Sequence, residues 1–101
     1  MDDNTVTITI DKDLEDLIPG YLENRRRDIA SIEEALRKND FETIGILGHS
    51  MKGSGGGYGF DAITEIGKRI EEAAKNMDKK VIAEQAEELS RYLHNIKIAY
   101  K

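Results

Sequence analysis

Apolar residues recur at intervals of three and four through most of the chain, and four such stripes can be followed. They are Leu22, Ile29, Ile32 and Leu36; then Phe41, Ile44, Leu47 and Met51; then Ile63, Ile66, Gly67, Ile70, Ala73, Ala74 and Met77; and finally Ile82, Ala86, Leu89, Leu93, Ile96 and Tyr100. This spacing places each stripe on one face of a helix. Four amphipathic helices with short connections predict an all-α fold, an antiparallel up-and-down four-helix bundle over about residues 11–101.

Acidic and glycine residues mark the expected helix boundaries. The turn Lys38-Asn39-Asp40 separates the first two helices, and Asp61 and Asp78 are expected to cap the third and fourth. The second helix is expected to run from about Asp40 toward Gly56, and the glycines beyond Ser54 are expected to end it. Gly57 or Gly59 would then supply a left-handed cap.

The N-terminal segment has a different pattern. Residues 5–10 alternate strictly between threonine and an apolar residue, which indicates extended backbone. No second strand is evident, so residues 1–10 are expected to be an extended arm lying on the bundle, or a partly disordered terminus. Asp11 or Asp13 can cap a short helix that Pro19-Gly20 would break or bend. This short N-terminal helix would carry Leu14, Leu17 and Ile18.

Composition narrows the classes of protein. A length of 101 residues with 39% hydrophobic positions suits one domain, residues 1–101. A net charge of −5 argues against nucleic acid as a partner. No apolar stretch is long enough for a membrane span and the start does not resemble a signal peptide, so a cytoplasmic protein that does not bind membranes is expected. The absence of cysteine excludes disulfides and thiolate metal sites.

His49 is the nucleophile with the most suggestive neighbours. In a helix it points away from the Ile44, Leu47 and Met51 stripe, and therefore toward solvent. Lys52 lies one turn later, where its ammonium can hold phosphoryl oxygens by charge-assisted hydrogen bonds. Small residues flank the imidazole and leave room for a partner. The expected docking positions are Gly45, Ile46, Gly53 and Gly56.

The motif His49-x-x-Lys52-Gly53-Ser54, followed by Gly59, resembles the signature of histidine-containing phosphotransfer (HPt) domains. The resemblance implies a four-helix bundle in which His49 takes a phosphoryl group from an aspartyl phosphate and passes it to another receiver. The implied partners are a response-regulator receiver domain and/or a hybrid histidine kinase. No autonomous kinase activity and no cofactor are implied, and any magnesium would be supplied by the receiver.

Two other functions stay open at this point. One is the phosphoacceptor domain of a chemotaxis-type histidine kinase, and the other is a non-enzymatic helical adaptor whose histidine motif is inactive. A nucleotide loop is not indicated by the glycines, and no metal is expected because His49 and His94 lack ligand spacing. Ser50 and Ser54 lack the partners of a hydrolase, although Ser54 could cap the helix or polarise the site.

Overall fold

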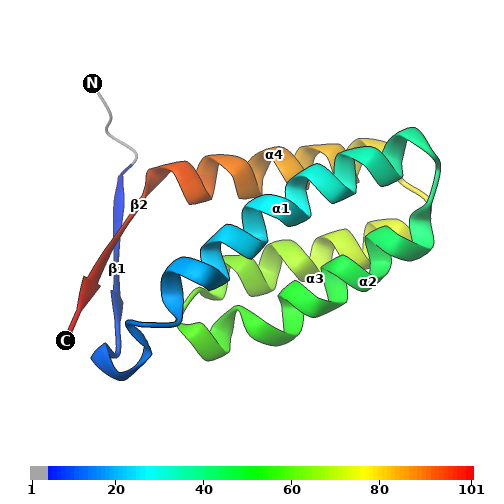
Figure 1. Cartoon of the computed structure of the whole chain (residues 1–101). Helices are drawn as coiled ribbons and strands as arrows, with labels where there is room; N and C mark the ends of the chain where they lie inside the picture. The colour runs from blue at the N-terminus through cyan, green and yellow to red at the C-terminus, as the bar shows by residue number, and fades with distance from the viewer. Residues whose placement is uncertain (1–4) are drawn as a thin grey trace.

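The computed structural model describes residues 5–101 and is mostly helical. The helices are α1 (Ile18–Arg37), α2 (Phe41–Ser54), α3 (Asp61–Lys75) and α4 (Lys79–Asn95), with the short 3-10 helices η1 (Lys12–Leu14) and η2 (Gly56–Tyr58). The strands are β1 (Val6–Ile10) and β2 (Ile96–Tyr100). The four expected helices are confirmed, and they lie side by side as a bundle (Figure 1).

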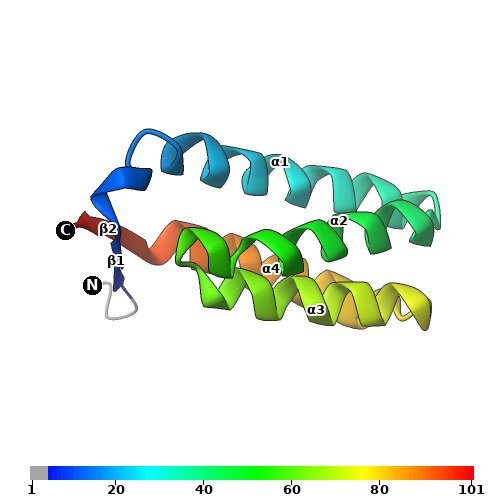
Figure 2. The same ribbon diagram turned by 90° about the horizontal axis from the view of Figure 1, so that it is seen from below.

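The chain passes along the bundle four times (Figure 1). It leaves the strands along α1, returns along α2, and repeats this course along α3 and α4. In Figure 2, α1 lies at one side of the bundle with no other element beyond it. The closest packing is between α2 and α3, and α1 contacts both α2 and α4.

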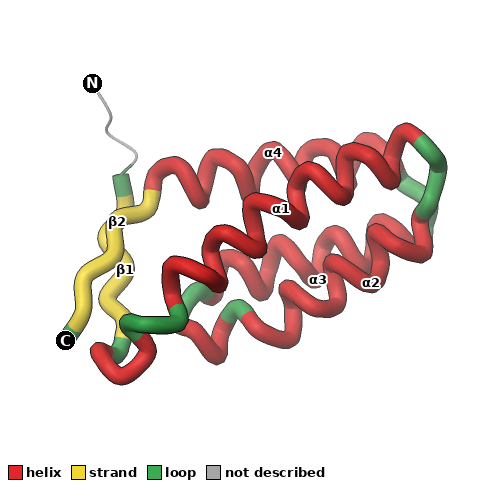
Figure 3. Tube along the Cα trace, in the orientation of Figure 1, coloured by secondary structure: helices red, strands yellow, loops and turns green. Residues whose placement is uncertain are grey.

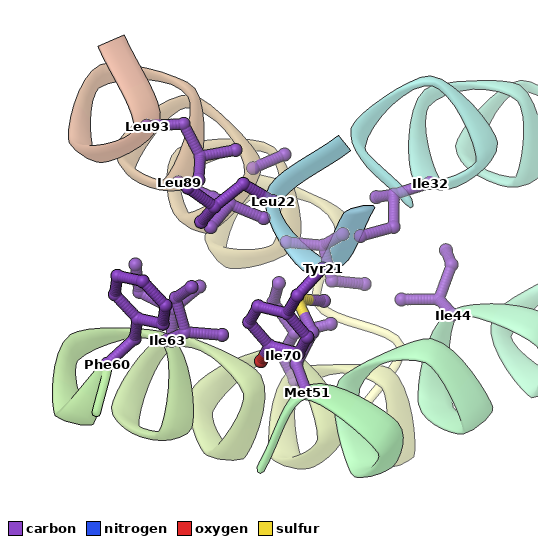
Figure 4. Close-up of a cluster of buried hydrophobic side chains, with 14 of the residues drawn as sticks. Tyr21, Leu22, Ile32, Ile44, Met51, Phe60, Ile63, Ile70, Leu89 and Leu93 are labelled. Atoms are coloured by element: carbon purple, nitrogen blue, oxygen red, sulfur yellow. The ribbon is translucent and has the colours of Figure 1, made fainter. Parts of the chain in front are cut away.

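The apolar stripes of all four helices meet in one core (Figure 4). It includes Tyr21, Leu22 and Ile32 from α1, Ile44 and Met51 from α2, Phe60, Ile63 and Ile70 at or within α3, and Leu89 and Leu93 from α4. Met77 departs from the predicted stripe. It follows α3 with a φ of 52° and is exposed, because the chain turns there toward α4.

Of the two expected caps, Asp78 is confirmed and Asp61 is wrong, while Asp40 of the expected turn also caps its helix. The Asp40 carboxylate accepts a hydrogen bond from Thr43 N at 3.1 Å, and that of Asp78 accepts one from Val81 N at 3.2 Å. Asp61 is not a cap, since it is the first residue of α3 and Phe60 precedes it. An acidic residue in the first turn still interacts favourably with the helix dipole.

The glycine run ends α2 in an ordered way. Gly55 follows the last helical residue, Ser54, and its amide donates to Met51 O at 3.0 Å. The helix therefore ends at Ser54, where the glycines that follow are expected to end it. Gly59 has a φ of 95°, a left-handed value that glycine adopts without strain, so the prediction of a left-handed residue at Gly57 or Gly59 is confirmed for Gly59.

The prediction that the N-terminal segment has no second strand is wrong. β1 pairs in parallel with β2, from Val6 opposite Ile96 to Ile10 opposite Tyr100. The strands stand together at one end of the bundle (Figure 3). Residues 1–4 of the expected arm lie outside the described residues.

The extension of the last helix to Ile96 and Tyr100 is consequently also wrong. Apolar residues at 96, 98 and 100 fit a strand, while residues 96 and 100 alone also fit a helix. Local periodicity leaves this ambiguity open. The pairing with β1, which is distant in sequence, selects the strand.

The short N-terminal helix does not form as expected. Only Lys12–Leu14 make a 3-10 turn, which Asp11 caps by accepting a hydrogen bond from Asp13 N at 2.9 Å. Ile18 already belongs to α1, and Pro19 lies in the first turn of that helix. A proline causes no break there, because the first amides of a helix have no carbonyl partner within the helix. The helices of the bundle therefore span residues 18–95 rather than 11–101.

Candidate functional site

Two glycines bring α2 and α3 into close contact beside the histidine. A Cβ added at Gly48 would lie 2.6 Å from the backbone nitrogen of Glu71, and one at Gly67 would lie 2.5 Å from that of Lys52. Any larger residue would force the backbones apart. Gly48 therefore serves a tight approach within the protein, and this approach places α3 next to the exposed face of α2.

His49, Lys52 and Glu71 form one hydrogen-bonded cluster across this contact. Nδ1 of His49 lies 2.9 Å from Oε2 of Glu71, and Nζ of Lys52 lies 3.0 Å from the other carboxylate oxygen. The side chain of His49 is 68% exposed, as its helical position predicts, whereas that of Glu71 is only 18% exposed. A half-buried carboxylate thus holds an exposed imidazole and an exposed ammonium together.

The charge state of Glu71 determines which histidine nitrogen is free. The hydrogen bond from Lys52 lowers the pKa of Glu71 below its ordinary value of 4.5, partial burial opposes this, and the bond from His49 adds to the lowering. Glu71 is therefore ionised at neutral pH and can only accept hydrogen bonds. Nδ1 of His49 must then carry the proton, which leaves the lone pair on Nε2.

The expected docking residues occupy two sides of His49. Gly45 and Ile46 lie on the side nearer the start of α2, where Ile46 is 64% exposed and a Cβ at Gly45 would come 3.7 Å from Ala74 Cβ. Gly53 faces open space one turn after His49. Gly56 lies beyond the end of α2, and its amide donates to Thr64 Oγ1 at 2.8 Å.

A hollow of about 470 Å³ adjoins His49 between α2 and α3. Its lining is mainly apolar, with charged residues at the edge. The lining residues are Phe41, Glu42, Gly45, Ile46, His49, Glu71, Ala74 and Lys75. Two of the expected docking residues therefore share one surface depression with the histidine.

Ser54 belongs to a separate packing cluster. Its hydroxyl and that of Tyr21 are 2.9 Å apart, and the Tyr21 ring stacks on Tyr58 with a centroid distance of 4.3 Å. The Arg25 guanidinium also lies over the Tyr21 ring, 4.4 Å from its centroid, and pairs with Asp28 at 2.8 Å. These contacts join α1 to the end of α2, and no bond from Ser54 to His49 is present in residues 5–101.

The sequence reasoning missed Glu71 and Thr64. Thr64 donates to Lys52 O at 3.3 Å and so holds the last turn of α2 against α3. A sequence signal existed, because Glu71 lies one turn after Gly67 and on the same helix face. It was not decisive, since nothing local in the sequence shows that Gly67 packs against Gly48.

Residues 5–101 lack the features of a metal site and of a membrane span. No group of three or more potential metal-ligating side chains is present there. The carboxylate that contacts His49 is that of Glu71. None of the helices in the same range combines the length and the apolar character that spanning a membrane requires.

Comparison with known proteins connects this geometry to a family. Neither the curated proteins nor the solved structures contain a significant match to the chain. The family model described as "Hpt domain" matches residues 16–99, which include all four helices and the whole His49 cluster. Because the match covers most of the sequence, the chain belongs to the Hpt domain family, with the histidine phosphotransfer role in phosphorelay signalling that this membership implies.

Proposed function

We propose that this protein is a phosphorelay carrier in which Nε2 of His49 accepts a phosphoryl group from the aspartyl phosphate of a receiver domain. It then passes the group to an aspartate of another receiver. The observation that carries the proposal is the contact of 2.9 Å between Nδ1 of His49 and Oε2 of Glu71, made while the His49 side chain stays 68% exposed. An exposed imidazole with its Nδ1 proton held by a carboxylate presents its other nitrogen to a partner.

The chemistry would need one bond exchange. The bond between phosphorus and the aspartyl oxygen breaks, a bond between phosphorus and Nε2 forms, and the aspartate leaves with the electron pair. Because Nδ1 keeps its proton, the ring becomes cationic as the new bond forms. The ionised Glu71 carboxylate would stabilise that cation and keep the ring oriented.

Lys52 would act on the phosphoryl oxygens. Its ammonium is held by Glu71 at 3.0 Å in the free protein, one helical turn from His49. It has three donors, so it can turn part of its hydrogen bonding toward a phosphoryl group on Nε2 while staying near Glu71. Positioning and charge stabilisation are most of what phosphoryl transfer requires of a protein.

The hollow between α2 and α3 would receive the partner. Ile46 and Phe41 offer apolar surface there, while the small Gly45 leaves the depression open. A receiver domain that inserts apolar side chains would bring its aspartate toward His49. The open space at Gly53 would leave room on the other side of the imidazole. Magnesium, if transfer requires it, would be held by the receiver.

The antiparallel order of the helices and a cytoplasmic location are parts of the same proposal. The alternating course of the chain in Figure 1 supports the first. The cytoplasmic location is proposed because a receiver partner is expected there.

The test is to offer the protein two phosphoryl donors in parallel. One is a receiver domain phosphorylated on its aspartate, and the other is the ATP-bound catalytic domain of a chemotaxis-type kinase. The proposal expects rapid labelling from the receiver and reversal on addition of an unphosphorylated receiver. Labelling by the kinase domain alone would favour the chemotaxis-type phosphoacceptor, and no labelling from either donor would favour the adaptor.

A further inference from the structure

The solvent-facing side of α1 carries an ordered pattern of charge. Its members, which we call the α1 face, are Glu23, Arg26, Arg27, Ala30, Glu33, Glu34 and Arg37, and all of them are exposed. They recur at intervals of three and four residues, so they form one stripe along the helix. Figure 2 shows this helix at one side of the bundle with no element beyond it.

The charges are antisymmetric about Ala30. Three residues before Ala30 is Arg27, and three residues after it is Glu33. Four residues before it is Arg26, and four residues after it is Glu34. At seven residues the pair is Glu23 and Arg37. Each charge on one half of the α1 face thus has the opposite charge at the matching place on the other half.

When a second copy of the helix runs in the opposite direction, an antisymmetric pattern brings each charge next to a charge of opposite sign on the other copy. We propose that the α1 face is a self-association surface whose partner is a second copy of this chain, packed antiparallel about a two-fold axis near Ala30. A two-fold contact uses the same patch on both copies. Helical geometry then places Arg26 opposite Glu33 of the second copy, Arg27 opposite its Glu34, and Glu23 opposite its Arg37.

Two further features of the α1 face fit this partner. Ala30, at the centre, is small enough to let two helix axes approach to about 8–10 Å. The α1 face holds three glutamates and three arginines, so its charges cancel in a chain whose net charge is −5. Two copies that meet here avoid the repulsion that their acidic surfaces would exert elsewhere.

A groove beside the α1 face supplies both polar surface, at Ser90 and His94, and apolar surface, at Ile29 and Ile96, for the second copy. The depression between α1 and α4 has a volume of about 610 Å³, and Ile29 and Leu93 lie in it with Arg26, Ala30 and Glu33 at its edge. The α1 helix of the second copy would lean toward this groove. Apolar contacts of this kind add to the attraction between the charges.

The charges of the α1 face are available for such contacts. Within the helix, Arg26 pairs with Glu23 at 3.4 Å and Arg37 pairs with Glu34 at 2.6 Å. Exposed pairs of this kind contribute little to stability, and a guanidinium has donors to share with a second carboxylate. The dimer should therefore be weak and sensitive to salt.

Self-association would leave His49 accessible in both copies. His49 lies in the α2–α3 groove, and its contact with Glu71 involves neither α1 nor α4. The inference is therefore independent of the proposed function, and a receiver could still reach either copy.

Analytical ultracentrifugation of the full chain over a range of concentrations tests the proposal. The dimer fraction should rise with concentration at low sodium chloride and fall at high sodium chloride. An acidic variant, Arg26→Glu/Arg27→Glu, and a basic variant, Glu33→Arg/Glu34→Arg, should each be monomeric alone. An equimolar mixture of the two should form a heterodimer, because the charges across the contact are again opposite.

A matched control separates this contact from the effect of the changed net charge alone. Glu84→Arg/Glu88→Arg changes the net charge as the basic variant does, but on exposed positions of α4. Mixed with the acidic variant it should give no heterodimer, and circular dichroism should show all variants folded. A wild-type chain that stays monomeric at low salt, or a control that pairs as well as the basic variant, would overturn the proposal.

Discussion

At the scale of single residues, the decisive contact is the one Glu71 makes with both His49 and Lys52. The sequence predicts an exposed His49 with Lys52 one turn later, and the structure agrees in both respects. It does not predict that a carboxylate from another helix joins them, because the contact depends on how α2 and α3 pack. The tautomer of His49, and with it the nitrogen proposed to accept the phosphoryl group, follows from that tertiary contact.

Replacement of Glu71 should change the tautomer of His49. In the wild type with a neutral imidazole, ¹⁵N NMR should show the proton on Nδ1. Glu71→Ala should give a mixture with the proton also on Nε2, and phosphoryl transfer should slow by about 10- to 100-fold, as when other orienting partners are lost. Glu71→Gln, whose amide oxygen still accepts a hydrogen bond, should recover most of the tautomer preference. An unchanged NMR spectrum for Glu71→Ala would mean that the contact does not orient the ring.

Replacement of Lys52 should separate transfer from binding. We expect Lys52→Ala to slow phosphoryl transfer by about 100-fold, similar to the loss of one oxyanion-stabilising donor, while receiver affinity changes little. Rapid-quench kinetics and calorimetric titration on the same preparation measure the two quantities. Equal losses of rate and affinity would instead make Lys52 a docking residue.

At the scale of elements, the site depends on the Gly48–Gly67 contact between α2 and α3. Helical periodicity predicts which faces of these helices are buried, and Ile44, Met51 and Ile63 are indeed buried. It does not predict how closely two helices approach. Glycines inside α2 can serve a partner protein or a neighbouring helix, and the structure distinguishes Gly48, which contacts α3, from Gly53, which contacts nothing within 4 Å of an added Cβ.

Substitution of these two glycines should have opposite effects on stability. Gly48→Ala should lower the free energy of unfolding by about 1 to 3 kcal/mol, because its Cβ would meet the α3 backbone. Gly53→Gln should leave that free energy unchanged or raise it by up to about 1 kcal/mol, because glutamine is the better helix former. Urea denaturation measures both.

The same glutamine should still impair transfer, because it stands one turn from His49 in the space a receiver needs to approach. If Gly53→Gln lowers the free energy of unfolding, Gly53 does not face open space as assigned. Unchanged transfer at unchanged stability would show that the partner docks elsewhere.

At the scale of the whole molecule, the two described ends of the chain close one end of the bundle. Ile10 of β1 is 2% exposed and packs beside Gly59, where an added Cβ would lie 2.6 Å from its Cδ1. The alternation of residues 5–10 predicts extended backbone correctly. It cannot predict the partner strand, because parallel pairing between segments near the two ends leaves no local signal and residues 96–100 also fit a helix.

Shortening the side chain of Ile10 should therefore destabilise the entire fold. Ile10→Ala should lower the free energy of unfolding by about 2 to 5 kcal/mol, the usual range for a buried isoleucine. Val6→Ala in the same strand is the control, since Val6 is 51% exposed and should change that free energy by less than about 0.5 kcal/mol. Equal effects of the two substitutions in thermal melts would contradict the assigned role of β1.

The most direct test of the central claim is to find the atom that carries the phosphoryl group. The protein is incubated with a phosphorylated receiver domain, and the label is mapped by mass spectrometry under alkaline conditions and by NMR of the imidazole nitrogens. The account predicts one acid-labile phosphoryl group on Nε2 of His49 and none on a folded His49→Ala variant. A label on Nδ1, on His94 or on the His49→Ala variant would contradict it.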